Sequence, residues 1–99
     1  MIGHLCNEMI QIIIQLPPVD SIKEKRRMVK SLKEKMISRY RVTAAEVDLQ
    51  DSLSFAQLGA AVVSNSRSHG EKIMHKILHF VEEECMGRIH DVQILSEQY

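Results

Sequence analysis

The sequence predicts an α+β domain with the element order β-α-β-β-α-β. Two observations support this order: four segments have the residues of strands, either alternating with a period of two, rich in β-formers or apolar on both faces, and in two longer segments apolar residues recur every three or four residues. The chain has 99 residues, a typical domain size, and 44% of them are hydrophobic. We therefore expect residues 1–99 to form a single domain around one core.

Residues 5–16 are predicted to form the first strand. The isoleucines at positions 10, 12 and 14 alternate with side chains of the opposite face, which is the pattern of a half-buried strand. The two prolines that follow end the strand, because proline cannot donate a ladder hydrogen bond. Met9, Gln11 and Ile13 then occupy the opposite face of the sheet.

A helix is predicted from Ser21 to about Ser38. Ser21 and Glu24 have the spacing of a capping box, in which each side chain satisfies a backbone N–H at the start of the helix. Apolar residues spaced by three, four or seven form one face of this helix: Ile22, Val29, Leu32, Met36 and Tyr40.

The middle of the chain is predicted to contain two strands joined by a polar loop. Residues 41–47 include the β-formers Val42, Thr43 and Val47, and residues 48–54 are the loop. The following strand, residues 55–65, is apolar on both faces in its middle, so we expect it in the centre of the sheet.

The last third of the chain is predicted to contain a helix and a final strand. The helix covers residues 68–86, with Gly87 as its C-terminal cap. Residues 89–95 form the strand. Two split β-α-β units in this order predict a four-stranded antiparallel sheet with both helices on one face, which is the ferredoxin-like arrangement.

The formal net charge is zero, with 13 basic and 13 acidic residues, but the charges are segregated. Between Lys23 and Arg41 there are nine basic and two acidic residues, a local charge of +7 that the rest of the chain balances. Zero net charge excludes binding of nucleic acid by the whole surface, although it allows a local basic surface. At about 100° per residue, one side of the first helix carries a basic stripe. Its members are Lys23, Arg26, Arg27, Lys30 and Lys33.

The basic stripe has two interpretations. It can hold the phosphates of RNA or of another polyanion, in which case binding falls steeply with salt. It can equally be a solvated helix face on which lysine and arginine stems cover apolar surface. If the acidic residues Glu46, Asp48 and Asp51 neutralise the stripe, the polyanion interpretation loses its main support.

Lys25 interrupts the apolar face of the first helix. It lies between Ile22 and Val29, where a lysine either extends its ammonium group past the start of the helix or pairs with a carboxylate. Glu46 on the second strand is the suggested carboxylate, so Lys25 and Glu46 are expected to form a structural ion pair between helix and sheet. The other interpretation is a lysine that binds a ligand.

Nothing in the sequence predicts catalysis, and we expect no enzyme, cofactor or metal. No phosphate-binding glycine loop or nucleophile–base pair is present. His75, His79 and Glu82 have chelating spacing, but surface residues explain them better. The chain has no run long and apolar enough to span a membrane and no visible signal peptide, so we expect a cytoplasmic protein.

The uncovered sheet face predicts self-association. Met9 and Ile13 make it too apolar to remain fully hydrated, so a homodimer through the sheet face or a sheet edge is expected. Stacking of RNA bases on this face is not expected, because Phe55 is the one aromatic residue on the two predicted central strands.

Three segments resemble the YlxP-like family of small bacterial proteins of unknown function. Residues 21–27, Ser-Ile-Lys-Glu-Lys-Arg-Arg, are similar to its S-L-K-E-K-R signature; residues 45–51 and 58–65 are similar to its A-E-V-x-x-x-D and L-G-x-A-x-V-S-N segments. The resemblance implies a ferredoxin-like fold. Members tend to be encoded beside translation-initiation and ribosome-maturation genes, which implies a role linked to RNA or the ribosome. Many members carry Trp-Gln-Arg in the following loop, where this chain has Leu53-Ser54-Phe55.

Two functional hypotheses follow. The first is a non-catalytic accessory protein that places its basic stripe on ribosomal RNA or a ribosome-associated protein. The alternative is a homo-oligomeric regulatory or scaffold domain that binds a protein or a small ligand. In that case Asp48 and Asp51 of one copy meet the basic stripe of its neighbour.

Overall fold

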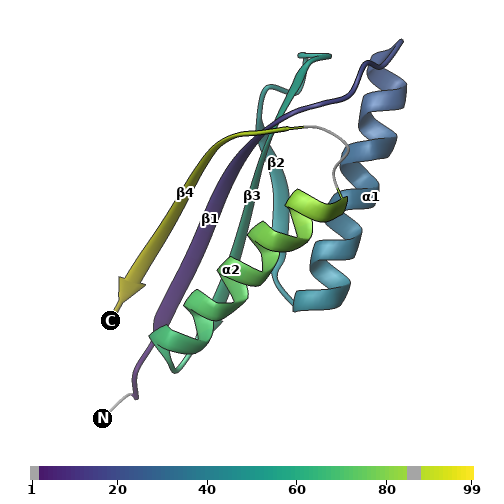
Figure 1. The fold of residues 1–99 in the computed structure, drawn as a ribbon. Helices are drawn as coiled ribbons and strands as arrows, with labels where there is room; N and C mark the ends of the chain where they lie inside the picture. The colour runs from purple at the N-terminus through teal and green to yellow at the C-terminus, as the bar shows by residue number, and fades with distance from the viewer. Residues whose placement is uncertain (1–2, 85–87) are drawn as a thin grey trace.

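The computed structural model describes residues 3–84 and 88–99 and contains four strands and two helices in the predicted order (Figure 1). These elements are β1 (Cys6–Gln15), α1 (Ile22–Tyr40), β2 (Thr43–Asp48), β3 (Phe55–Ser64), α2 (Arg67–Glu84) and β4 (Arg88–Gln98). The ferredoxin-like α+β fold is therefore confirmed. The predicted cap at Gly87 and the last two residues of the predicted second helix lie outside the described residues.

The four strands form one antiparallel sheet in the order β2-β3-β1-β4. Ile12 in β1 lies opposite Leu58 of β3 and Val92 of β4, so apolar residues face each other across three strands. The central position predicted for β3 is confirmed, since β3 has β1 on one side and β2 on the other. β1 and β3 thus form the middle of the sheet, and β2 and β4 form its edges.

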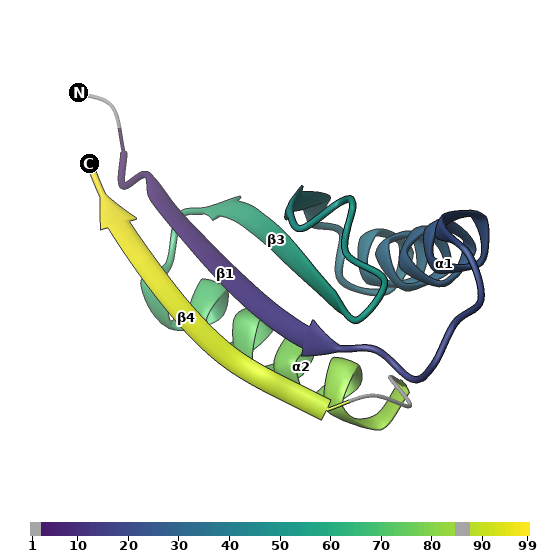
Figure 2. The same ribbon diagram turned by 90° about the horizontal axis from the view of Figure 1, so that it is seen from above.

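The period-two pattern separates the two faces of the sheet. The even-numbered residues of β1 are buried, and they form the core with side chains from both helices. This core includes Ile10, Ile12, Ile14, Val29, Met36, Leu58, Met74, Ile77 and Phe80. Figure 2 shows α2 crossing beneath β1 and β4, whereas α1 lies beyond β3, on the β2 side of the sheet. Both helices therefore cover the same face and leave the opposite face open.

The first helix begins as predicted but ends later. Ser21 Oγ accepts the backbone N–H of Glu24 at 3.1 Å, and the Glu24 carboxylate accepts the N–H of Asp20 at 2.9 Å. At the other end, α1 continues to Tyr40 and closes at Arg41, which has a left-handed φ of 55° and donates its N–H to Ile37. Residue 41 was predicted to begin the second strand; it is instead the cap of the helix.

The final strand is longer than predicted and contains an irregularity. β4 runs to Gln98 because its pairing with β1 continues to Cys6, and Tyr99 donates its N–H to Leu5 at 2.9 Å. The register shifts between Ile13 and Ile14, and His90 lies against Phe55 with ring centroids 5.6 Å apart. Leu5 and Tyr99 therefore lie at the same end of the sheet, and Figure 2 shows the start of β1 beside the end of β4.

Neither α1 nor α2, the two helices in the described part of the chain, is long and apolar enough to cross a membrane. Both are amphipathic instead. Each buries a few residues on one face, such as Val29 and Met36 in α1 and Met74 and Ile77 in α2. Their function in the fold is to cover one side of the sheet.

Candidate functional site on the first helix

The basic stripe lies on the side of α1 that faces away from the core. Its five residues project to one side of the buried line formed by Lys25, Val29 and Met36. Four of them are exposed and Lys33 is half-buried. The members are Lys23, Arg26, Arg27, Lys30 and Lys33. One helix therefore presents five cationic side chains along about three turns.

The stripe is largely unpaired. Lys30 lies 4.0 Å from Glu34, and both side chains are mostly exposed, at 75% and 66%. Such a pair contributes little to stability and is easily exchanged for another anion. Within residues 3–84 and 88–99, no carboxylate lies within 4.0 Å of the other four members. The stripe therefore keeps most of its positive charge.

The remaining basic residues of α1 have partners in the fold. Lys35 lies 3.1 Å from Glu84 of α2, and the Arg39 guanidinium lies 4.9 Å above the ring of Phe80, also in α2. These two contacts connect the helices. The charges of α1 thus divide into a group that holds the fold together and a group that faces solvent.

The acidic residues that sequence analysis suggested as neutralising partners do not reach the stripe. Glu46 lies 3.3 Å from Lys25, which is not a stripe residue. Asp48 accepts the backbone N–H of Leu49 at 2.7 Å, and Asp51 is exposed. No ion pair joins either aspartate to a described basic residue. In this structure the acidic loop leaves the stripe accessible.

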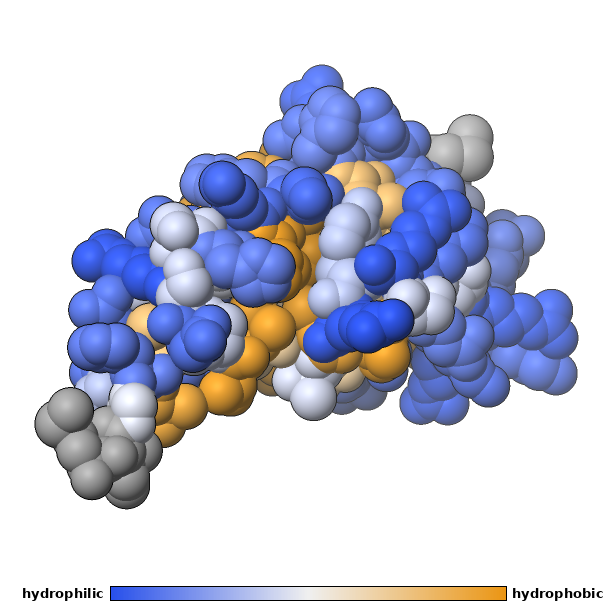
Figure 3. Space-filling model, turned by 90° about the horizontal axis from the view of Figure 1, so that it is seen from below, coloured by the Kyte–Doolittle hydropathy of each residue, from blue (hydrophilic) through white to orange (hydrophobic). Residues whose placement is uncertain are grey.

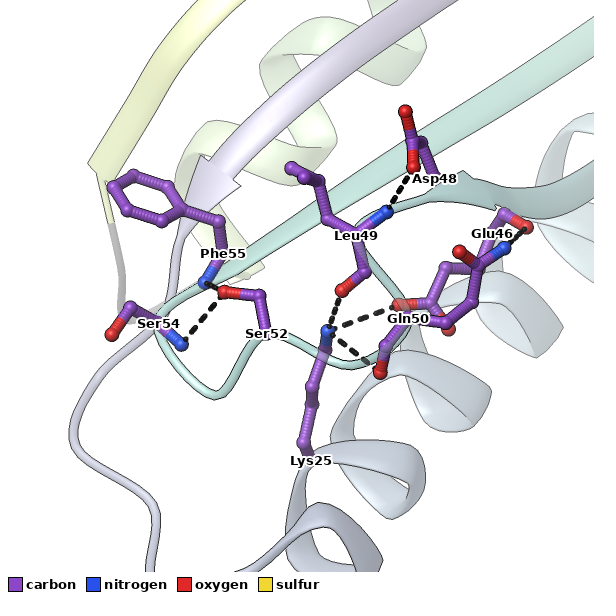
Figure 4. Close-up of polar contacts among 8 residues, drawn as sticks. All are labelled: Lys25, Glu46, Asp48, Leu49, Gln50, Ser52, Ser54 and Phe55. Carbon is purple, nitrogen blue, oxygen red and sulfur yellow. Dashed lines mark hydrogen bonds and ion pairs between the residues drawn. The ribbon is translucent and has the colours of Figure 1, made fainter.

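Lys25 is buried at 1% exposure and anchors the loop between β2 and β3 (Figure 4). Its Nζ donates to the carbonyl oxygens of Leu49 at 2.5 Å and Gln50 at 3.4 Å, and it lies 3.3 Å from Glu46 Oε2. The two carbonyls accept hydrogen bonds, whereas Glu46 Oε2 forms an ion pair with Nζ and has no hydrogen-bond partner in the described chain. We name this arrangement the Lys25 clamp.

The loop folds back on itself so that its carbonyls reach Lys25. Leu49 has a left-handed φ of 64°, and Ser52 donates its N–H to the Leu49 carbonyl at 3.0 Å. Ser52 Oγ then accepts the N–H groups of Ser54 and Phe55, which leads the chain into β3. The clamp therefore joins the first turns of α1 to the end of β2. Two hydrogen bonds and one ion pair to the protein's own oxygens hold the ammonium group, as expected for a lysine that joins a helix to a loop.

A second buried charged residue, Glu8, was not identified from the sequence. Its side chain is completely buried; Ser96 Oγ donates to Oε1 at 2.5 Å, while Oε2 has no hydrogen-bond partner. Gly70 of α2 packs directly on it, since a Cβ at that position would overlap Glu8 Cγ. The signal was its position: Glu8 shares the even parity of the buried β1 isoleucines.

The histidines do not form a metal site in the described part of the chain. His75 and His79 are exposed on α2, and His79 Nε2 lies 3.0 Å from Glu83, one turn further along. No group of three or more potential ligands is found among residues 3–84 and 88–99. The chelating spacing noted in the sequence therefore corresponds to a surface of the helix.

Fold and site together define a small ferredoxin-like α+β domain with a basic stripe and a buried lysine clamp on its first helix. A family model described as "Protein of unknown function (DUF503)" matches residues 8–94, so the chain belongs to this family. The chain is also 32% identical, over 62 residues, to the "Uncharacterized protein YlxP" of Bacillus subtilis (strain 168). That alignment covers 63% of this chain and 67% of the relative. The YlxP-like resemblance is thereby confirmed.

Proposed function

We propose that this protein is a non-catalytic, cytoplasmic accessory protein that binds RNA through the basic stripe of α1. Ribosomal RNA is the class of RNA that we propose it binds. One observation carries the proposal: four of the five stripe residues have no carboxylate partner within the described chain. Phosphate groups are the natural counterions for such a row, because arginine and lysine contact them through charge-assisted hydrogen bonds.

The zero net charge is consistent with this proposal. A neutral domain has little general attraction for nucleic acid, so binding has to come from the face where positive charge is concentrated. Each phosphate contact releases condensed counterions, and affinity depends on salt accordingly. The Lys25 clamp connects the start of α1 to the loop after β2, and the Lys35–Glu84 pair connects α1 to α2.

The proposal is tested by cosedimentation with ribosomal particles. A variant with Arg26, Arg27 and Lys30 all changed to Glu should lose association with the particles at low salt, because three attractive contacts become repulsive. The matched control changes Lys72, Lys76 and Arg88 to Glu, exposed residues on other elements that give the same change in net charge. The control should still sediment with the particles.

The result that contradicts the proposal is clear. If the α1 variant remains bound while folded, as judged by its circular dichroism, the stripe does not contact RNA. If both variants lose binding equally, overall charge rather than the stripe governs association, and the proposed site is wrong.

A second candidate function is a homo-oligomeric regulatory or scaffold domain, supported by the open face of the sheet. Val47, Val63 and Leu95 are 48%, 66% and 36% exposed. A shallow hollow of about 400 Å³ lies on this face, over small residues such as Gly59 and Ala61. An exposed apolar face of this kind is typical of an interaction surface. The opposite side of the molecule, which carries α1 and α2, also exposes a band of apolar residues between polar surfaces (Figure 3).

Analytical ultracentrifugation at low and high salt separates these candidates. A dimer formed by the open sheet face should persist at high salt, since apolar burial does not depend on charge screening. A dimer formed by the acidic loop and the stripe of a neighbour should dissociate as salt screens the charges. A monomer at every salt and protein concentration rejects the oligomeric candidate and leaves RNA binding unaffected.

A further inference from the structure

The two helices and one end of the sheet enclose a hollow of about 370 Å³. Its floor is formed by the end of β1 and the start of β3, and its wall by α1. The apolar residues on these surfaces are Ile14, Leu16, Ala56, Leu58, Val29 and Leu32. The hollow opens to the surface between α1 and the last turn of α2, beside Ser31 and Glu84.

The volume of this hollow is comparable with those of two other hollows at the surface, of about 400 and 390 Å³, so its lining rather than its size distinguishes it. Pockets that bind small molecules are generally about 300–1,000 Å³ and are lined mainly by apolar side chains with a few polar groups. The hollow between α1 and α2 fits that description, because its accessible lining includes the half-buried apolar side chains of Leu16, Met28 and Leu32, above the buried core residues Ile14 and Leu58.

The charged groups at the mouth favour an anion. Arg27, Lys35 and Glu84 lie around the opening. Lys35 and Glu84 are 3.1 Å apart and neutralise each other, whereas Arg27 has no carboxylate within 4.0 Å in the described chain. The mouth therefore carries one positive charge in excess, on a guanidinium that can bind a carboxylate through two hydrogen bonds.

We infer that this hollow is a binding site for a small amphiphilic carboxylate, with its hydrocarbon body against the half-buried side chains of Leu16, Met28 and Leu32 and its acid group on Arg27. Charge complementarity and apolar lining select this class. A sugar or nucleoside would place hydroxyl groups against side chains that cannot hydrogen-bond to them. The inference goes beyond the proposed RNA function and does not depend on it, although Arg27 belongs to both surfaces.

The test is a titration of the intact protein with decanoate, followed by methyl resonances in ¹H–¹³C spectra. We expect saturable shifts at the accessible methyl groups that line the hollow, those of Leu16, Met28 and Leu32, with Val47 and Val63 on the open sheet face unaffected. Decanol, which has the same chain without the charge, should bind about tenfold more weakly, as expected for loss of one charge-assisted contact.

Two variants, Arg27→Gln and Ser31→Phe, and one control identify the site. Arg27→Gln should weaken decanoate binding about tenfold and leave decanol binding unchanged, because only the charged contact is removed. Arg26→Gln is the matched control: it removes the adjacent stripe charge but does not line the hollow, so decanoate binding should persist. Ser31→Phe places a ring at the mouth from an exposed position and should abolish binding of both molecules.

Three results would overturn the inference: shifts that map to the open sheet face, a decanoate affinity unchanged by Arg27→Gln, or no saturable binding. Failure here is distinguishable from failure of the RNA proposal. Arg26→Gln and Lys30→Gln weaken RNA binding alone, whereas Ser31→Phe blocks the hollow and keeps the charge of the stripe. Thermal unfolding followed with each variant confirms that it is folded before either affinity is interpreted.

Discussion

At the scale of single residues, Lys25 determines how α1 is joined to the sheet. A buried ammonium group is costly unless every donor has an acceptor, and here a carboxylate and two backbone carbonyls lie within 3.4 Å of Nζ. The helical period in the sequence placed Lys25 on the apolar face of the helix and suggested Glu46 as its partner. It could not identify the carbonyls of Leu49 and Gln50, because they reach Lys25 only through the left-handed turn at Leu49.

The Lys25 clamp makes a stability prediction. Lys25→Met should destabilise the protein by about 3 kcal/mol, because the apolar side chain keeps the volume but leaves Glu46 and two carbonyls without their partner. Urea unfolding monitored by circular dichroism measures the change. Lys23→Met, at an exposed position two residues earlier, should change the stability by less than about 0.5 kcal/mol. Equal effects of the two substitutions would contradict the structural role of the clamp.

Glu8, unlike Lys25, is a buried residue whose contacts were not predicted from the sequence. The alternating pattern of β1 placed it on the buried face, yet its importance depends on Gly70, 62 positions later in the chain. Only a glycine in α2 leaves room for the Glu8 side chain, and Ser96 comes from the far end of β4. Three segments distant in sequence build this contact. Periodicity within one segment therefore cannot predict it.

At the scale of elements, local signals predicted where structures begin better than where they end. The capping residues Ser21 and Glu24 marked the start of α1 correctly. Its end was placed about two residues early, because Arg41 supplies the left-handed cap that glycine usually supplies. The length of β4 was also underestimated, since its last three residues are polar and are held by pairing with β1 rather than by a pattern of their own.

The cap of α1 predicts a stabilising substitution. Arg41→Gly should raise stability by about 1 kcal/mol, because glycine adopts the left-handed conformation without the steric cost that a Cβ imposes. In a domain of this size that corresponds to a rise of about 4–8 °C in the midpoint of thermal unfolding. Arg41→Ala removes the same charge but keeps the Cβ, so its midpoint should stay near that of the unsubstituted protein. A rise of equal size for Arg41→Ala would show that charge, rather than backbone conformation, limits this end of the helix.

At the scale of the whole molecule, the segregation of charge distinguishes this domain. The sequence predicted both the fold and the basic stripe, because alternation, helical period and charge sum are properties of short segments. Whether the acidic loop covers the stripe was not predictable, since it depends on how β2 and α1 meet. In the structure, the one acidic residue of that region in an ion pair, Glu46, contacts the buried Lys25. Basic residues that are close in sequence therefore differ in role: the buried Lys25 stabilises the fold, whereas the exposed stripe residues face solvent.

The salt dependence of RNA binding tests the central claim, that the stripe binds phosphates, most directly. We predict that fluorescence anisotropy with a labelled single-stranded RNA, between about 50 and 200 mM salt, gives a plot of log K against log salt with a slope of about −2 to −3.5, as expected for three to five phosphate contacts. Changing Lys33 alone to Gln should reduce the magnitude of that slope by about 0.7. A slope near zero, or one that Lys33→Gln leaves unchanged, would contradict the account.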